Sequence, residues 1–119
     1  MELKTAINEI LDREQSVKSA LILDKDGIVL LEVVRDNYKS AQELAIEYAT
    51  ALQQIIKVTD ILSLGGLEEI LVSTDKSVIV IRLITRSYYL ILVIDNEGNI
   101  GKAKYLAKRT VELIKDEFV

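Results

Sequence analysis

The sequence predicts a single α+β domain in which five antiparallel strands carry helices on both faces. Apolar patterns along the 119 residues follow the order α-β-β-α-β-β-β-α. The turns between successive strands are too short for parallel connections, so neighbouring strands must run antiparallel. The strands of the C-terminal half are apolar on both faces, so each face of the sheet needs a covering layer of helix.

The N-terminal part predicts one amphipathic helix followed by a hairpin. Apolar residues recur at helical spacing from Leu3 to about Gln15. Residues 17–24 and 28–34 are β-branched and leucine-rich runs separated by Lys25-Asp26-Gly27. The Asp-Gly pair supplies the positive-φ position that a tight hairpin turn requires.

A long central helix is predicted to start at a capping box. Ser40-Ala41-Gln42-Glu43 has the Ser-x-x-Glu form, in which the first and last side chains cap the first turn of a helix. The helical pattern continues through Ile56 and up to Leu62, and Gly65-Gly66 then supplies flexible backbone that stops it.

The C-terminal half predicts a three-stranded meander and a last helix. The strands are residues 67–74, 78–85 and 88–95, joined by short polar turns. Asn99 can cap the helix that follows. One face of that helix collects its apolar residues, which are Ala103, Leu106, Ala107, Thr110, Val111, Ile114 and Phe118.

The composition excludes several classes of chemistry. The chain has no His, Cys, Trp or Pro, so it lacks soft-metal ligands, disulfides and any Ser/His or Cys/His catalytic pair. Its net charge of −4 has the wrong sign for a domain that holds phosphate backbones, which argues against nucleic acid. We therefore expect no enzyme activity, no catalytic residue, no metal site and no bound cofactor.

The distribution of apolar residues also bears on the cellular location of the protein. The longest apolar run, residues 88–94, is far shorter than the ~20 residues of a membrane-spanning helix. The N-terminus begins with Met1-Glu2-Leu3-Lys4 and lacks the basic start and apolar core of a secretion signal. We expect a cytoplasmic protein without membrane insertion.

Two glycine turns have a superficial likeness to ligand-binding loops. Residues 24–27, Asp-Lys-Asp-Gly, lack the remaining carboxylates of a calcium loop, and a hairpin turn explains them better. Residues 98–103, Gly-Asn-Ile-Gly-Lys-Ala, have two residues between the glycines where a phosphate loop has four, and Ala103 replaces its Ser or Thr. A nucleotide therefore belongs to a partner if it is involved at all.

Two groups of basic residues allow a functional and a plainer interpretation. Arg86 lies in a two-residue turn, where it could present an arginine finger to a GTPase, but a turn residue that favours solubility is the preferred interpretation. The last helix carries five cations that could meet an acidic partner, although acidic neighbours on the same helix favour a solvated face. These cations are Lys102, Lys104, Lys108, Arg109 and Lys115.

The central helix has an apolar arc too wide for one sheet. Its apolar residues fill roughly 180°, whereas a helix on a sheet shows a stripe of about 100°. A helix sunk in the core of one chain would explain this, but a helix shared between two copies explains it better. Ala41, Ala45 and Ala49 form a row of small side chains along which a second helix could approach closely.

Three motifs stand out beside the order of elements. They are Gly-Gly-Leu-Glu-Glu-Ile at 65–70, Tyr-Tyr-Leu-Ile-Leu-Val at 88–93, and the glycine turn at 98–103 that opens the last helix. Together with the order of elements they resemble the roadblock family, relatives of a dynein light chain. The resemblance covers essentially all of the chain, as a single domain over residues 1–119. It implies a profilin-like sheet with the middle helix on one face and the terminal helices on the other.

The resemblance also implies a homodimer in which third strands pair and middle helices pack side by side. Prokaryotic members of the family commonly bind small Ras-like GTPases, including as GTPase-activating subunits. The predicted dimer interface comprises Ala41, Leu44, Ala45, Tyr48, Ala49, Leu52, Ile55, Glu69, Leu71 and Ser73.

We therefore predict a non-enzymatic homodimeric module that binds a small Ras-like GTPase and regulates its nucleotide cycle. A structural scaffold without kinetic effect and a profilin-like sensor of small ligands are the alternatives. The predicted docking surface is a polar strip of the middle helix with Ile46 as its apolar anchor. We call it the polar strip; it comprises Gln42, Glu43, Ile46, Glu47, Thr50, Gln53, Gln54 and Lys57.

Overall fold

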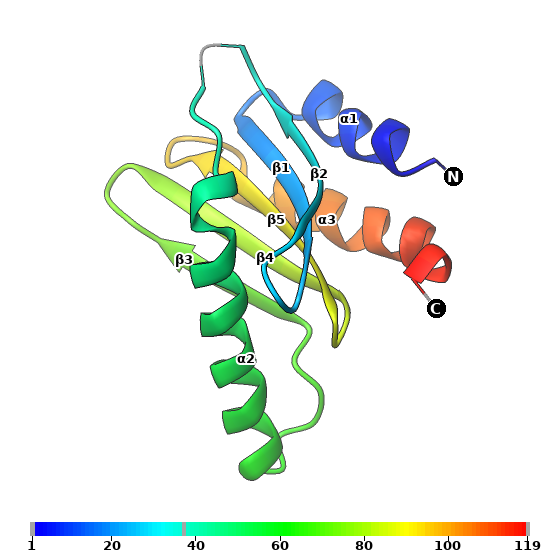
Figure 1. Cartoon of the computed structure of the whole chain (residues 1–119). Coiled ribbons are helices and arrows are strands. Elements are labelled where there is room, and N and C mark those ends of the chain that lie inside the picture. The colour runs from blue at the N-terminus through cyan, green and yellow to red at the C-terminus, as the bar shows by residue number, and fades with distance from the viewer. Residues whose placement is uncertain (1, 37, 119) are drawn as a thin grey trace.

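The computed structural model describes residues 2–36 and 38–118, which form one five-stranded sheet between two layers of helix (Figure 1). The element order agrees with the prediction. The helices are α1 (Leu3–Arg13), α2 (Ala45–Ile61) and α3 (Ile100–Ile114), with single 3-10 turns at Gln42–Leu44 and Lys115–Phe118. The strands are β1 (Val17–Asp24), β2 (Val29–Val34), β3 (Glu69–Ser73), β4 (Ser77–Thr85) and β5 (Tyr88–Asp95).

The strands are antiparallel throughout and lie in the order β2-β1-β5-β4-β3. Helix α2 covers one face of this sheet, and α1 and α3 lie together on the other (Figure 1). The three-layer arrangement predicted from the two-sided apolar strands is therefore confirmed. Strands β2 and β3 form the two edges of the sheet.

Each central strand supplies side chains to two separate cores. In β1, Ala20 and Ile22 pack toward α1 and α3, while Leu21 and Leu23 pack toward α2. The same alternation runs along β5, where Leu92 joins the first core. Because successive side chains of a strand point to opposite faces, two-sided apolar strands require helices on both sides.

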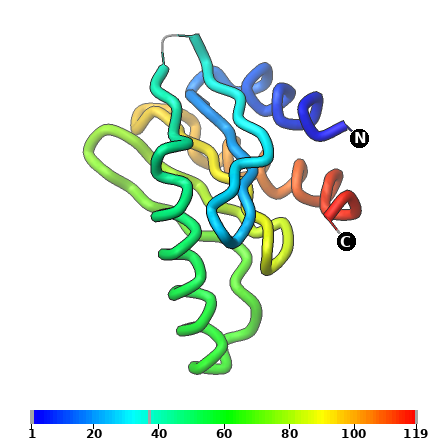
Figure 2. The backbone as a smooth tube through the Cα atoms, in the orientation of Figure 1, coloured from blue at the N-terminus to red at the C-terminus, as the bar shows by residue number. Residues whose placement is uncertain are grey.

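The turn between β1 and β2 rests on the first turn of α2. One carboxylate oxygen of Asp24 accepts hydrogen bonds from the N–H groups of Asp26 (2.9 Å) and Ile28 (3.0 Å). Gly27 has the predicted positive φ, at +86°, and a Cβ there would lie 2.7 Å from the Cα of Ile46. Glycine is therefore required both by the backbone conformation and by the close approach of α2 (Figure 2).

The predicted capping box does not form. The hydroxyl of Ser40 donates to the Glu32 carboxylate at 2.6 Å, and the same carboxylate accepts the N–H of Ala41 at 2.9 Å. A 3-10 turn follows, and α2 begins at Ala45 without a side-chain cap. Glu32 on the neighbouring β2 strand thus replaces Glu43 as the partner of the segment that leads into the helix.

The other helix ends agree with the sequence to within a few residues. Helix α1 stops at Arg13, where Glu14 takes an extended backbone conformation and its side chain accepts hydrogen bonds from the N–H and hydroxyl of Ser16. Helix α2 stops at Ile61, before the two glycines, where Ser63 takes a left-handed conformation. The carboxamide oxygen of Asn99 accepts the N–H of Lys102 at 3.0 Å, as predicted for the cap of α3.

None of the helices formed by residues 2–36 and 38–118 has the length and apolarity needed to cross a membrane.

Candidate interaction surface

The side of α2 that faces the sheet combines two alanines with two larger aliphatic residues. Ala45, Ala49, Leu52 and Ile56 are buried against β1, β4 and β5 of the same chain, and Ala45 is only 2% exposed. Small side chains let the helix axis lie close to the sheet. Four of the residues predicted to form the interface between copies, Ala41, Ala45, Ala49 and Leu52, are buried in the core of the single chain.

A second apolar surface of α2 points away from the sheet. We call it the apolar seam, and its spacings alternate between four and three residues, as in a coiled coil. Tyr48 is half-buried and the other members are exposed. The apolar seam comprises Leu44, Tyr48, Ala51, Ile55, Val58 and Leu62. Of the predicted interface residues on the helix, Leu44, Tyr48 and Ile55 thus remain accessible to a partner.

Strand β3 presents an open row of backbone groups at the edge of the sheet. The O of Glu68 accepts the N–H of Leu83 at 3.0 Å, and the N–H of Thr74 donates to the O of Ser77 at 2.8 Å. Because pairing alternates along an antiparallel ladder, the even-numbered residues face β4. The N–H and C=O groups of Glu69, Leu71 and Ser73 therefore point outward, away from the described strands.

The side chains of β3 divide between the two faces of the sheet. Ile70 packs into the core beneath α2. The carboxylate of Glu69 lies on the opposite face, 3.3 Å from the Arg82 guanidinium and 3.4 Å from the Lys104 ammonium of α3. The predicted contribution of Glu69 to a partner is therefore restricted to its backbone, since its side chain is already paired within the chain.

The polar strip lies along the flank of α2, and all eight of its members are exposed. Ile46 is 65% exposed and sits against the β1–β2 turn through Gly27. The side-chain amide of Gln53 donates a hydrogen bond to the hydroxyl of Tyr89. Desolvation raises the pKa of Tyr89, so its hydroxyl stays protonated. The exposure of the strip agrees with the prediction, and its role in docking stays a prediction.

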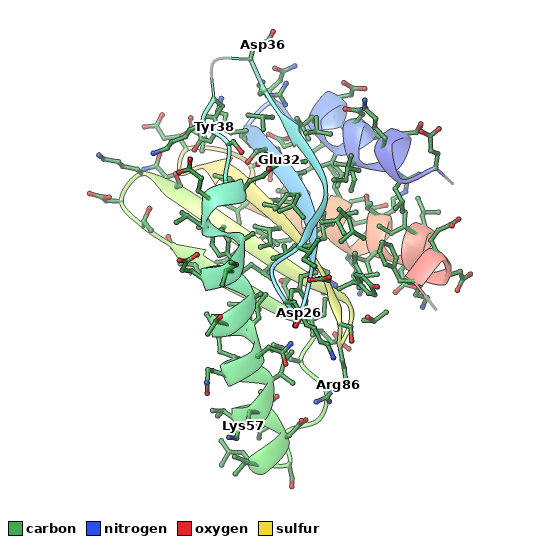
Figure 3. The ribbon with its side chains drawn as sticks, viewed as in Figure 1. Asp26, Glu32, Asp36, Tyr38, Lys57 and Arg86 are labelled. Atoms are coloured by element: carbon green, nitrogen blue, oxygen red, sulfur yellow. The ribbon has the colours of Figure 1, made fainter. Side chains whose placement is uncertain are left out.

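Arg86 reaches from the β4–β5 turn to the C-terminal end of α2 (Figure 3). Its guanidinium binds both carboxylate oxygens of Asp60, at 2.6 Å and 3.3 Å. These hydrogen bonds lower the pKa of Asp60 below its ordinary value. Arg86, the candidate arginine finger of the sequence analysis, thus forms an ion pair that links the β4–β5 turn to α2.

A cavity of about 340 Å³ lies at the N-terminal end of α2. We call it the N-terminal cavity; its apolar lining is provided by Tyr38, Ala41, Leu44, Tyr48, Ile79 and Val93. Lys39, Ser40 and Glu43 border it on the side of the segment that leads into α2, and Thr74 and Ser77 border it at the β3–β4 turn. Burial raises the pKa of Tyr48, and the nearby Tyr38 contributes in the same direction. The cavity and the apolar seam are continuous, because Leu44 and Tyr48 belong to both.

The other motifs have structural roles. A Cβ on Gly98 would meet the side chain of Ser16, so this glycine permits a close contact between turns. Within residues 2–36 and 38–118, no group of three or more carboxylates could hold a metal ion. Three cations of α3 form ion pairs with Glu14, Glu69 and Glu9 of other elements, and Lys115 of the 3-10 turn that follows pairs with Glu112.

The fold is similar to that of roadblock domains of known structure. The Roadblock/LC7 domain from Streptomyces avermitilis has a TM-score of 0.85 at 16% identity over 99% of this chain and 98% of that chain. Gliding protein MglB from Thermus thermophilus has a TM-score of 0.85 at 20% identity, covering 96% and 86%. MglB from Myxococcus xanthus has a TM-score of 0.87 at 12% identity, covering 98% and 94%.

The family assignment follows from the sequence. Residues 1–116 match the family described as "Mitogen-activated protein kinase kinase 1 interacting", and the chain belongs to this family. None of the curated proteins matches the sequence. The roadblock architecture predicted from the motifs is confirmed.

Proposed function

We propose that this chain is a non-enzymatic homodimeric module that binds a small Ras-like GTPase and regulates its nucleotide cycle. The observation that supports the dimer is that the apolar seam of α2 and the edge of β3 are both exposed in the single chain. An exposed apolar seam beside an unprotected strand edge is unfavourable in a lone monomer. The proposal of a GTPase as partner rests on the resemblance to the roadblock family and on the exposed polar strip.

The positions of the apolar seam support an antiparallel pair of helices. They are arranged symmetrically about Gln53, so a two-fold axis opposite this residue brings each seam position against another seam position. Leu44 then lies beside Leu62 of the second copy, and Tyr48 beside its Val58. Ala51 lies near the axis, where its small side chain permits close approach.

The backbone of β3 supports one register for strand pairing across the same axis. Because Glu69, Leu71 and Ser73 point their backbone groups outward, a symmetric ladder is centred on Leu71. Leu71 then exchanges hydrogen bonds with its own symmetry mate, and Glu69 with Ser73 of the second copy. The two sheets become one continuous sheet.

The two edges of the sheet differ in how well they could pair. Strand β2 carries a bulge at Leu30, because Ile22 pairs with Leu31 and Leu23 pairs with Val29. A bulge interrupts the row of edge groups and disfavours edge-to-edge pairing. The β3–β4 ladder has no such shift in register. This difference supports β3 as the edge that meets the second copy.

Docking of the GTPase is assigned to the polar strip, with Ile46 as the apolar anchor. In the proposed dimer the strip around Ile46 stays outside, because Ile46 lies against the β1–β2 turn. Glu43, near the N-terminal end of the strip, borders the N-terminal cavity. Since Arg86 is held by Asp60, acceleration of hydrolysis would come from ordering the switch loops of the GTPase. No catalytic group of this chain is required.

The dimer is tested by the molar mass in sedimentation at micromolar concentration, which we expect to be twice 13.4 kDa. Two isoleucines of α2 provide a matched pair of variants. Ile55→Asp places a charge in the apolar seam and should yield a folded monomer. Ile46→Asp changes an equally apolar residue outside the seam and should leave the dimer intact. A monomeric wild-type protein would refute the proposal.

The register is tested by disulfide trapping, which is unambiguous because the chain has no cysteine. In the proposed ladder Leu71 faces its symmetry mate at a Cα separation of about 5.5 Å, within the range of a disulfide. Leu71→Cys should therefore cross-link two chains under mild oxidation. Val72→Cys, one residue further along the ladder, should not. Equal cross-linking of both variants would contradict this register.

The GTPase is tested with a Ras-like GTPase from the same organism, loaded with a fluorescent GTP analogue. Binding is measured by fluorescence anisotropy and hydrolysis by phosphate release, for the wild-type protein and for Ile55→Asp. Ile46→Asp should weaken binding while remaining dimeric. Binding without any change in nucleotide hydrolysis or exchange would favour the scaffold alternative. Absence of binding in the wild-type protein would refute the regulator.

A further inference from the structure

An exposed apolar tip follows the last turn of α2. We call Ile61, Leu62 and Leu64 the apolar tip; they are 70%, 59% and 70% exposed. The segment extends past the sheet at the lower end of α2 (Figure 1). Three aliphatic side chains left in water at one place are costly unless another surface covers them.

The apolar tip has a fixed shape. The N–H of Leu62 donates to the O of Val58 at 3.0 Å, and the N–H of Leu64 donates to the O of Thr59 at 3.0 Å. The Arg86–Asp60 ion pair ties the preceding helical turn to the sheet. A partner would therefore meet a segment that is already ordered, which lowers the entropic cost of binding.

A receptor of matching chemistry lies at the other end of the same helix. The N-terminal cavity has a largely apolar lining and opens beside Tyr38, at the end of α2 remote from Lys57 and Arg86 (Figure 3). One copy cannot bring its own apolar tip to its own cavity, because α2 separates them by its full length. A second copy in antiparallel orientation can.

The symmetry of the apolar seam brings the two features together. An axis opposite Gln53 places the C-terminal end of one α2 beside the N-terminal end of the other. The β3–β4 turn borders the N-terminal cavity through Thr74 and Ser77, so the cavity lies between α2 and the strand edge that the proposed dimer pairs. Antiparallel pairing of the α2 helices thus places the C-terminal end of α2 of one copy at the N-terminal cavity of the other.

We propose that the apolar tip of each copy inserts into the N-terminal cavity of the other, so that two such contacts flank the two-fold axis. The inference rests on the proposed dimer, and it adds that the apolar tip of the second copy occupies the cavity. The contact closes the cavity to small ligands, which separates this protein from a profilin-like sensor. It also buries Leu64, which lies outside the apolar seam.

The contact is tested with one variant on each side. Leu64→Asp places a charge on the apolar tip, and Tyr38→Lys places the opposite charge at the mouth of the cavity. Both residues are in connecting segments, so the helices and strands are unchanged. Leu113→Asp, an exposed leucine of α3, is the matched control. Circular dichroism verifies that each variant is folded.

Each variant alone should weaken the dimer about tenfold or more, because both contacts are lost in its homodimer. In an equimolar mixture, the heterodimer retains one wild-type contact and pairs the two opposite charges in the other. Native mass spectrometry with one variant isotope-labelled should therefore show heterodimer well above its statistical share. The control should dimerise like the wild-type protein.

Three results would overturn the inference. Wild-type dimer affinity in both variants would mean that the apolar tip and the cavity lie outside the interface, while the proposed dimer would stand. Weakened homodimers with a statistical share of heterodimer would mean that the two features do not touch each other. A monomeric wild-type protein would remove both the inference and the proposed dimer.

Discussion

Replacing Gly27 by alanine should destabilise the protein more than any other glycine-to-alanine change in the loops around α2. The new Cβ would lie 2.7 Å from the Cα of Ile46, which is backbone and cannot rotate away. The β1–β2 turn must then move off the helix, at an overpacking cost of about 1–3 kcal/mol. The φ of +86° adds about 1–2 kcal/mol for a residue with a side chain. The free energy of unfolding should fall by about 2–5 kcal/mol.

Two glycines at the end of α2 separate these contributions. Gly65 has a similar φ, +91°, but a Cβ there would meet nothing within 4 Å, so Gly65→Ala should cost about 1–2 kcal/mol. Gly66 has an open environment and no positive φ, and Gly66→Ala should be neutral or stabilising by up to about 1 kcal/mol. The Gly27 variant should therefore lose the most stability of the three.

The assay is urea unfolding followed by circular dichroism, with all variants at one protein concentration because the proposed dimer would make stability depend on concentration. A Gly27→Ala variant no less stable than Gly65→Ala would refute the reasoning. It would mean that the β1–β2 turn does not rest on the helix backbone. Ile46 would then lack the support that positions it within the polar strip.

Further outcomes follow from single buried or paired groups. Ser19 is fully buried and its hydroxyl has no hydrogen-bond partner among the described residues, so Ser19→Ala should leave the free energy of unfolding unchanged or raise it by up to about 1 kcal/mol. Leu52→Ala should lower it by about 2–5 kcal/mol in the same urea assay, because the side chain is buried beneath α2. The carboxyl of Asp60 should titrate below its ordinary pKa by NMR and return to it in Arg86→Ala. Because folding lowers this pKa, the ion pair stabilises the folded state at pH values above the ordinary pKa of the carboxyl. This stabilisation is lost as the pH falls through the lowered pKa. If the pKa of Asp60 is the same in Arg86→Ala as in the wild-type protein, the ion pair does not persist in solution.

Local patterns predicted most elements because their causes are local. Strands β1 and β5 have the predicted bounds, since their apolar runs end at the Asp-containing turns that follow. The positive φ of Gly27 and the cap of α3 by Asn99 depend on two to four neighbouring residues, so the sequence contains them in full.

The errors came from contacts between segments distant in sequence. A helical projection identified the wide apolar arc of α2, but it could not tell which part of the arc faces the sheet. Ala45 and Ala49 lie on that side together with Leu52 and Ile56, and the exposed seam includes Leu44, Ile55 and Val58. Likewise, Glu32 displaced the predicted cap, and Asp60 bound Arg86, through contacts that only the folded chain creates.

The strand order makes the centre of the sheet the last part of the chain to be completed. Strand β1 is synthesised early, yet one of its two neighbours is β5, so Val17 lies opposite Ile94. Strands β3, β4 and β5 can form a meander by local contacts, whereas β1 must wait for the end of that meander. On the ribosome, the first hairpin therefore emerges before β5, its partner in the sheet, and α2 emerges before the sheet that it covers is complete. Formation of the β1–β5 ladder is the step that joins the two halves of the chain, and changes that delay it would expose both cores to aggregation during synthesis.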